Sequence, residues 1–250
     1  MTRWLDLYEP IDVPTPIGDG LWVVDGPLVR MTFAPAMRVP FPTRMVIARL
    51  RGGELWVWSP TELTNELRAR VDALGTVRHL ISPSRLHYTH IATWQRAYEG
   101  SIAWASPGVR ERAASHGNEV HFDRDLGDVA ESDWEGEIDQ LIFRGSRTIE
   151  EVVFFHRSSR TLVLADLIEN FERKKLGLTW RLMATLGGVL DPDGKAPIDF
   201  RATFAGHKDV ARACLQRMQA WQPERIVMAH GRWYDKDGGE ELARAFRWLR

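Results

Sequence analysis

The chain has 250 residues, with 33 Lys and Arg against 34 Asp and Glu and a formal net charge of -1. This balance disfavours a protein that coats nucleic acid, because such proteins carry a clear excess of basic residues. Hydrophobic residues make up 44% and charged residues 27%, which is ordinary globular composition. The single cysteine, Cys214, excludes an intramolecular disulfide and a cysteine-rich zinc finger, so any metal must be bound by His, Asp or Glu.

The sequence shows no feature of a membrane or secreted protein. No apolar run approaches the roughly 20 residues that a membrane-spanning helix needs. The N-terminus carries Asp6 and Glu9 where a signal peptide would need a long apolar core. We therefore expect a cytoplasmic protein with no membrane or nucleic-acid partner. The sequence gives no basis for predicting its oligomeric state.

The first sixty residues indicate short β-strands separated by Gly and Pro. Gly52-Gly53 is typical of a hairpin turn between the last two of these strands. The segment therefore predicts an antiparallel sheet. The expected strands are 21–24, 28–31, 45–50 and 55–58.

From Ser59 the hydrophobic spacing changes to that of a helix. Apolar residues recur at spacings of four, four and three between Leu63 and Leu74, with Thr64 as the predicted N-cap and Gly75 at the predicted end. A strand at 77–82, a helix through 94–98 and a strand at 102–105 follow, and this alternation is typical of an α/β layer.

Beyond a polar, acidic segment at about 117–139, the second half repeats this alternation. The expected elements are a strand at 140–143, a hairpin of 151–155 and 161–165, a helix at about 174–186, a loop at 187–197, a helix at about 209–221, a strand at 225–228 and a helix at 240–249. The two sheet-plus-helix halves, about 1–125 and 126–250, predict one αββα sandwich that forms a single domain over 1–250.

Three predicted strand ends carry residues that suit a metal site. His87 and His90 follow the strand at 77–82 and are three residues apart, so both rings can project from one face of a first helical turn. Asp166 ends the strand at 161–165, where it either points into the ligand crevice of an α/β protein or caps a turn.

The third strand end carries His230, which directly follows the strand that begins at Arg225. Gly231 comes next, and its missing side chain allows close approach of the backbone to whatever His230 binds. Each feature is weak evidence alone. Strand ends converge when their strands are neighbours, however, so the three together favour a metal site.

The order of these features resembles the metallo-β-lactamase superfamily: a strand, a His-rich turn, a hairpin that ends in Asp, and a last strand that ends in His-Gly. Five stretches more closely resemble one bacterial branch of it, the domain-of-unknown-function group 4336. The resemblance covers nearly the whole chain and implies an α/β, metallo-β-lactamase-like αββα fold. The five stretches are FPTRM at 41–45, LWVWSP at 55–60, GTVRHLI at 75–81, EVVFFHRSSRTL at 151–162 and AHG at 229–231.

The superfamily's first motif, H-x-H-x-D-H, falls on residues 85–90, where Arg85 replaces the first His and Thr89 replaces the Asp. Its third metal-site His would fall near 146–148, where the sequence has Ser-Arg-Thr. The resemblance therefore implies a reduced site with one divalent metal, Zn or Fe. The implied ligands are His90, Asp166 and His230, with His87 as the fourth. Asp166 would also orient the attacking water, which makes Asp166 and His90 the expected catalytic residues.

The two departures from the motif suggest a binding role for arginine. Arg85 and Arg147 would place positive charge near the position of a second cation, and a guanidinium binds a carboxylate or phosphate in bidentate fashion. One hypothesis is a small anionic ligand shared by metal and arginine. The other is that Arg85 forms a salt bridge with Asp166 and closes an empty site. Trp94 is a third candidate for substrate binding, although a core position is better supported.

The resemblance implies a metal-dependent hydrolase that acts on an ester, thioester, lactone or phosphodiester of a small molecule. The alternative is a non-catalytic, metal-poor member that binds a small anion or a protein partner. The sequence lacks a Gly-x-Ser-x-Gly elbow, a Gly-rich phosphate loop and a dinucleotide fingerprint, which disfavours serine hydrolases, NTPases and dehydrogenases.

Overall fold

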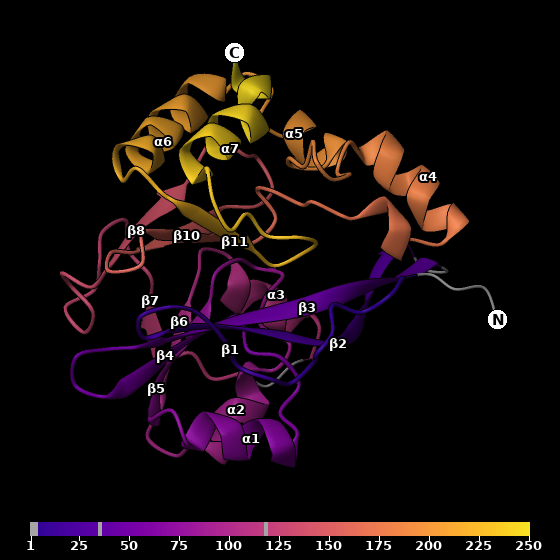
Figure 1. Cartoon of the computed structure of the whole chain (residues 1–250). Helices are drawn as coiled ribbons and strands as arrows, with labels where there is room; N and C mark the ends of the chain where they lie inside the picture. Colours follow the sequence, from indigo (N-terminus) through magenta and orange to yellow (C-terminus); the bar gives the residue numbers. More distant parts are fainter. Residues whose placement is uncertain (1–4, 35–36, 118–119) are drawn as a thin grey trace.

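Two β-sheets lie face to face, with helices on the outer side of each (Figure 1). The computed structural model describes residues 5–34, 37–117 and 120–250, without the side chains of residues 31–34, 37 and 38. Residues 1–4, part of the N-terminus used in the signal-peptide argument, lie outside the described residues, as do 118 and 119 in the acidic segment. The predicted αββα sandwich is confirmed.

Within the described residues the larger sheet has seven strands in chain order, β1 to β7. Strands β1 to β4 pair antiparallel, and β4 to β7 pair parallel. The predicted Gly52-Gly53 hairpin therefore joins β3 to β4. The strands are β1 (Thr15–Gly18), β2 (Leu21–Ala34), β3 (Met37–Arg49), β4 (Glu54–Trp58), β5 (Thr76–Ser82), β6 (Ile102–Ala105) and β7 (Arg124–Asp125).

Three helices pack against the outer face of this sheet: α1 (Asn65–Asp72), α2 (Ile91–Ala97) and α3 (Val109–Ser115). Figure 1 shows α1 and α2 on that side. The predicted cap of α1 is confirmed, because the Thr64 hydroxyl accepts the backbone N–H of Leu67 at 3.1 Å. The helices bury their apolar side against the sheet and leave its other face for the second sheet.

The predicted strands at 21–24 and 28–31 are one continuous strand, β2. Pro27 does not end it, because the register with β3 shifts between Gly26 and Leu28, and a proline at such an irregularity needs no ladder hydrogen bond. Strand β3 is likewise longer than predicted and contains Pro40 and Pro42. On the side of β3 that faces β4, only residues 46–49 are paired. The two prolines therefore remove no hydrogen bond on that side.

The smaller sheet has four strands among the described residues, in the order β11-β10-β9-β8. Strands β9 and β10 form the predicted hairpin, and β10 pairs parallel with β11. Helices α6 and α7 cover its outer face (Figure 1). The elements are β8 (Ile138–Phe143), β9 (Glu151–His156), β10 (Thr161–Leu164), α6 (Lys208–Ala220), β11 (Arg225–Met228), α7 (Gly238–Ala245) and a closing 3-10 turn, η2 (Arg247–Leu249).

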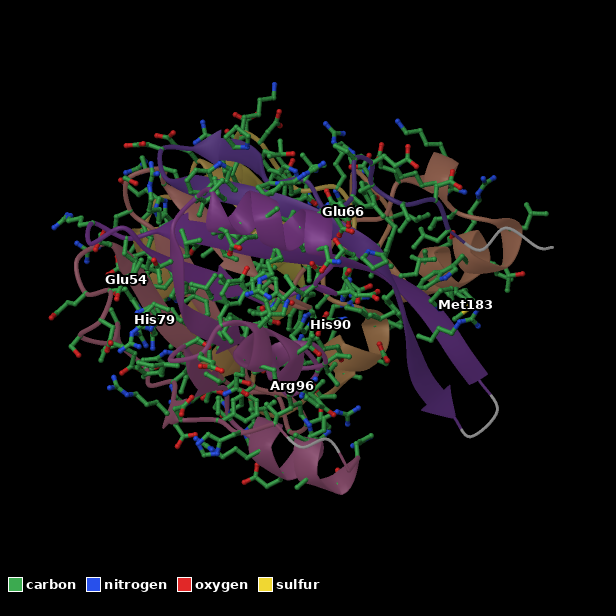
Figure 2. The ribbon with its side chains drawn as sticks, turned by 90° about the horizontal axis from the view of Figure 1, so that it is seen from below. Glu54, Glu66, His79, His90, Arg96 and Met183 are labelled. Atoms are coloured by element: carbon green, nitrogen blue, oxygen red, sulfur yellow. The ribbon has the colours of Figure 1, made fainter. Side chains whose placement is uncertain are left out.

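Between β10 and α6 the chain leaves the sandwich and forms α4 (Leu178–Gly187) and α5 (Ile198–Ala202), preceded by the 3-10 turn η1 (Arg173–Lys175). The sequence predicted α4 but not the five-residue α5. Figure 2 shows Met183 of α4 beside the long β2–β3 hairpin, with His79 and Glu54 toward the opposite end of the molecule. The contact is apolar, since Trp180 of α4 packs edge-on against Phe41 of β3 with ring centroids 5.1 Å apart.

The inner faces of the two sheets form one core, to which the larger sheet contributes Trp56, Trp58 and Trp104 and the smaller sheet Phe154. These rings fill the space between the sheets. The larger sheet ends at Asp125 and the smaller begins at Ile138. The assignment of the chain as a single domain stays a prediction. No helix among the described residues is long and apolar enough to cross a membrane.

Candidate functional site

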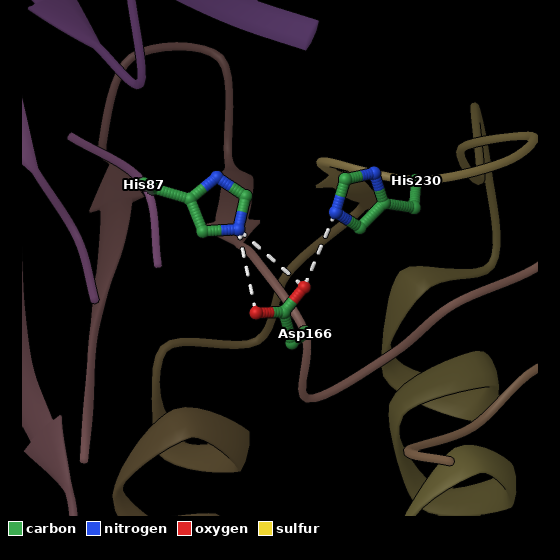
Figure 3. Close-up of side chains that lie close together, drawn as sticks. All are labelled: His87, Asp166 and His230. Carbon is green, nitrogen blue, oxygen red and sulfur yellow. Dashed lines mark hydrogen bonds and ion pairs between the residues drawn. The ribbon is translucent and has the colours of Figure 1, made fainter. Parts of the chain in front are cut away.

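Three of the predicted site residues meet at one point. His87, Asp166 and His230 each offer one nitrogen or oxygen atom within 4.8 Å of the other two (Figure 3). His87 Nε2 lies 3.4 and 3.3 Å from the two carboxylate oxygens of Asp166, and His230 Nε2 lies 3.3 Å from Asp166 Oδ1. Asp166 and His230 are buried, and His87 is partly buried. We call this group the His-Asp-His site.

The strand order of the smaller sheet places Asp166 beside His230. Strands β10 and β11 are parallel neighbours, with Leu164 paired to Met228. Asp166 and His230 each follow their strand by two residues, so both lie at the carboxyl end of the sheet at the same level. His87 comes from the other sheet, in the loop between β5 and α2. The site therefore joins the two halves of the sandwich.

A buried glutamate holds the Asp166 turn in place. The Glu151 carboxylate accepts the backbone N–H groups of Ala165, Asp166 and Leu167 at 2.5, 2.8 and 3.2 Å. Glu151 is 1% exposed, and burial raises the pKa of its carboxyl while these three N–H groups oppose the rise. The turn after β10 thus depends on a side chain from β9, which the sequence did not reveal.

The remaining ring nitrogens of both histidines are also bonded. His230 Nδ1 lies 2.9 Å from the carbonyl oxygen of Pro42, so it must carry the proton and donate it. His87 Nδ1 is 3.0 Å from the Ser59 hydroxyl. Ser59 follows β4 with a left-handed φ of 49°, an uncommon conformation for serine that places its hydroxyl at His87.

Arg44 of β3 fixes the loop that carries His230. Its guanidinium is 2% exposed and donates to the carbonyl oxygens of Met228 and Gly231 at 2.8 and 2.7 Å. The charge is balanced by Asp25, 2.7 Å from Nη2. Gly231 has a φ of 94°, and a Cβ there would lie 2.2 Å from the backbone oxygen of Asn170. The glycine is therefore required by the neighbouring backbone, and its predicted close approach to a ligand of His230 stays a prediction.

The three residues of the His-Asp-His site could hold a metal ion. Two imidazole nitrogens and a carboxylate oxygen are a donor set that Zn²⁺ and Fe²⁺ accept. The separations of 3.3 to 3.4 Å are long for charge-assisted hydrogen bonds, which measure about 2.7 to 2.9 Å. The His–Asp separations are close to the edge of a tetrahedron of ligands about 2.05 Å from a common centre, roughly 3.3 Å, and the three candidate ligand atoms all lie within 4.8 Å of one another. The outer hydrogen bonds to Ser59 and Pro42 are those that orient metal-binding histidines.

The charges at the site come mainly from buried acids. Burial alone would raise the pKa of Asp166, but the facing rings of His87 and His230 outweigh it and hold that pKa well below its usual range. Glu169, three residues further along, is 7% exposed, and burial raises its pKa to about 8. Sequence reasoning missed Glu169, since only the fold turns the segment after Asp166 back toward His230.

His90 is not part of the His-Asp-His site. It lies at the N-terminus of α2, and its Nε2 atom is buried without a hydrogen-bond partner among the described residues. Burial lowers the pKa of its ring. Figure 2 shows its place in the middle of the molecule. His87, and not His90, lies beside Asp166 and His230, and the predicted ligand and catalytic roles of His90 stay predictions.

The predicted substrate-binding residues lie elsewhere. Arg85 donates from Nη1 to the carbonyl oxygen of Thr148 at 3.0 Å, and with Arg147 it lines a separate open depression. The expected Arg85–Asp166 salt bridge is not formed, because the ion pairs of Asp166 within the described residues are with His87 and His230. Trp94 is fully buried in the core under α2 and donates its indole N–H to the Thr61 carbonyl. Its predicted binding role is wrong.

Two cavities meet at the His-Asp-His site. The first, the polar cavity, has a volume of about 240 Å³ and is lined by Arg30, Arg44, Ser59, His87, His90 and His230, with other residues of the larger sheet and its loops. The second, the apolar cavity, has a volume of about 470 Å³. It is lined by Phe41, Trp180, Met183, Val189, Ile198 and Phe200, with the acids Asp166, Glu169 and Asp199 and with His230. His230 borders both, which places the site at their boundary.

A family model supports the resemblance seen in the sequence. The model described as "Domain of unknown function (DUF4336)" matches residues 32–182. The chain belongs to this family. The matched segment contains His87 and Asp166 but ends before His230. A comparison with curated proteins finds no match.

Solved metallo-beta-lactamases share the fold. The DIM-1 enzyme exposed to ceftazidime has a TM-score of 0.62 and 13% identity, covering 100% of this chain and 98% of its own. The enzyme from Pontibacter korlensis has a TM-score of 0.60 and 15% identity, covering 98% and 99%. FIM-1 from Pseudomonas aeruginosa, in a mono-zinc form, has a TM-score of 0.61 and 14% identity, and the match covers 97% of each chain. At these identities the likeness shows the metallo-β-lactamase-like fold alone.

Proposed function

We propose that the chain is a metal-dependent hydrolase with one divalent ion, zinc or iron, bound by His87, Asp166 and His230. The observation that carries this proposal is the geometry of the site. Two Nε2 atoms face one carboxylate at the spacing of metal ligands, and both opposite ring nitrogens have partners that direct Nε2 inward.

The fold supports the same conclusion. His87, Asp166 and His230, which follow three strands, lie together, and the fold is shared with metallo-beta-lactamases. FIM-1, solved in a mono-zinc form, is a precedent within the fold for a single ion. Arg85 stands where the superfamily motif has a histidine, and Thr89 stands where it has an aspartate. Residues 146–148 also lack the third histidine, so the remaining ligands suit a single ion.

A divalent ion at the site would supply Lewis acidity toward a carbonyl or phosphoryl oxygen and would lower the pKa of water. The residues of the chain supply orientation and proton transfer. Asp166 is held as a carboxylate by the two histidines, and Glu151 fixes its turn. Glu169 borders the apolar cavity with Asp166 and His230 and can carry a proton to the leaving group, because its raised pKa keeps the carboxyl protonated near neutral pH. His90, which lines the polar cavity, is a second candidate.

The substrate class includes uncharged carboxylic esters, thioesters and lactones of small molecules, with phosphodiesters as the charged alternative. In each, water adds to the electrophilic centre, the bond to the leaving oxygen or sulfur breaks, and the proton of the water passes to the leaving group. A cytoplasmic location stays a prediction from the sequence.

The test is the metal content of untagged protein, purified without chelator and measured by plasma mass spectrometry. We expect about one equivalent of zinc or iron in the wild type and its loss in His87→Ala and His230→Ala. His121→Ala is the matched control, because His121 lies on the surface with a side chain that is 83% exposed. It should keep the metal.

The alternative function is a non-catalytic binding protein. It would be supported by wild-type protein that binds neither zinc nor iron after reconstitution at micromolar concentration. That result would overturn the hydrolase proposal, as would metal that persists in both histidine variants.

A further inference from the structure

The apolar cavity is formed by elements outside the sandwich. Helices α4 and α5 close over the end of β3, and Trp180 and Met183 of α4 line the wall together with Phe41. The Phe41 ring of this wall has its centroid 5.3 Å from that of His230, and Asp166 and His230 line the same cavity. An apolar group in this cavity therefore has a continuous path to the His-Asp-His site.

The charges around the apolar cavity disfavour an anionic ligand. Its described lining contains Asp166, Glu169 and Asp199 and neither lysine nor arginine. The arginines that the sequence suggested for anion binding, Arg85 and Arg147, line the neighbouring depression, which shares only Ile149 with the cavity in the described lining. A carboxylate or phosphate would find no lysine or arginine partner in this described lining, whereas an uncharged chain would gain from contact with aromatic and aliphatic walls.

The polar cavity on the other side of His230 has a larger share of polar lining than the apolar cavity. Arg30, Ser59, Thr89 and His90 provide polar groups there, beside apolar residues such as Leu86, so the cavity can bind a hydrophilic group at these four side chains. The site thus separates an apolar compartment from a polar one, and a ligand that fills both is amphipathic, with its reactive bond at the boundary.

We propose that the apolar cavity binds the uncharged acyl chain or aryl group of a carboxylic ester or thioester, whose carbonyl lies at the His-Asp-His site and whose polar leaving group lies in the polar cavity. This inference rests on the proposed function and narrows it to one substrate class. Water adds to the carbonyl carbon, the C–O or C–S bond breaks, and the proton of the water leaves with the alcohol or thiol. The products are an acid and that alcohol or thiol.

The rim of the apolar cavity explains exposed apolar side chains on α4 and α5. Leu186 and Ile198 line the cavity although they are 68% and 57% exposed. A bound chain would cover them, and each methylene that it buries should raise the specificity constant by roughly fourfold. Leu182, 62% exposed on the same helix, is outside the described lining and serves as a matched control.

The activity experiment compares p-nitrophenyl acetate with p-nitrophenyl octanoate. We expect kcat/KM to be at least about 100-fold higher for octanoate, because six further methylenes enter the cavity. Leu186→Asp should lower the octanoate-to-acetate ratio at least tenfold, since it adds a charge at the rim. Leu182→Asp should leave that ratio within twofold of the wild type. A ratio near one in the wild type, or an equal fall in both variants, would overturn the inference.

A binding experiment separates this inference from the hydrolase proposal. Isothermal titration with 2-decanone and 2-butanone measures the cavity without any reaction. Tighter binding of 2-decanone that Leu186→Asp weakens and Leu182→Asp does not supports the cavity, even where no ester is hydrolysed and the hydrolase proposal fails. Ester hydrolysis without 2-decanone binding supports the hydrolase and overturns the cavity assignment.

Discussion

The larger sheet carries histidines in two contrasting settings, one inside β5 and one beyond its end. His79 lies in β5 and is 1% exposed, among the tryptophans between the sheets. The Trp104 indole N–H donates to His79 Nδ1 at 3.2 Å, and the nearest carboxylate, on the exposed Glu54, is 4.0 Å from Nε2. His87, five residues beyond β5, instead faces the buried Asp166.

The buried ionisable groups differ in charge between the two settings. Burial lowers the pKa of His79 to about 4, so the ring stays neutral and acts as a hydrogen-bond acceptor in the core. At the His-Asp-His site a carboxylate is buried with the histidines, and it stays ionised because two rings face it. A strand interior and a strand end thus give the same residue type different chemistry. The difference is the presence of a buried carboxylate aimed at Nε2.

The largest effect is expected when the Asp166 carboxylate is replaced by an uncharged amide. Asp166→Asn should weaken metal binding about a thousandfold, because it removes the one charged ligand. Competition with a chromophoric chelator measures the affinity. His79→Gln is the control and should bind metal as the wild type does. Affinity in Asp166→Asn within tenfold of the wild type would remove Asp166 from the ligand set.

The next largest effect concerns stability and the Glu151 side chain, which accepts the backbone N–H of Asp166. Glu151→Gln should lower the free energy of unfolding by about 3 kcal/mol, because an amide NH₂ replaces an oxygen that accepts buried backbone N–H groups. Urea unfolding measures the change. The neighbouring, less buried Glu150→Gln should change stability by less than about 0.5 kcal/mol. Equal effects of the two substitutions would show that Glu151 does not hold the turn.

The His79 setting predicts a dependence of stability on pH. The folded pKa, about 4, is below the unfolded value of 6.5, so the unfolded chain takes up the proton first. The contribution of His79 is complete above pH 6.5 and is lost as the pH falls toward 4. Between pH 7.5 and 4.5 the wild type should lose about 2.5 kcal/mol more than His79→Gln, as seen in denaturant titrations. Parallel losses in the two proteins would contradict the buried neutral ring.

The smallest effect concerns the outer hydrogen bond of His87. Ser59→Ala should weaken metal binding about tenfold, because His87 loses the partner that orients its ring. Ser106→Ala removes another buried hydroxyl, whose oxygen has no hydrogen-bond partner among the described residues, and should leave the affinity unchanged. Chelator competition again provides the measurement. Unchanged affinity in Ser59→Ala would show that Ser59 does not orient the ring.

Much of the fold could be predicted from periodicity, because the apolar strands and the α1 cap are local signals. The continuous β2 and the short α5 could not be. Pro27 interrupts the pattern of β2, but its place at a register shift depends on β3. Helix α5 has five residues and forms by packing Phe200 against the core, with little local signal.

The sequence by itself determined which residue types end the strands, and therefore that His87, Asp166 and His230 were candidates. The resemblance ranked His90 above His87 as a ligand, whereas the structure brings His87 to Asp166, because the choice depends on which ring faces the turn after β10. Only the tertiary structure placed Glu151, Ser59 and the apolar cavity around the site. These contacts join residues far apart in the chain, and their free energy comes from burial and backbone hydrogen bonds that exist only when the two sheets pack together.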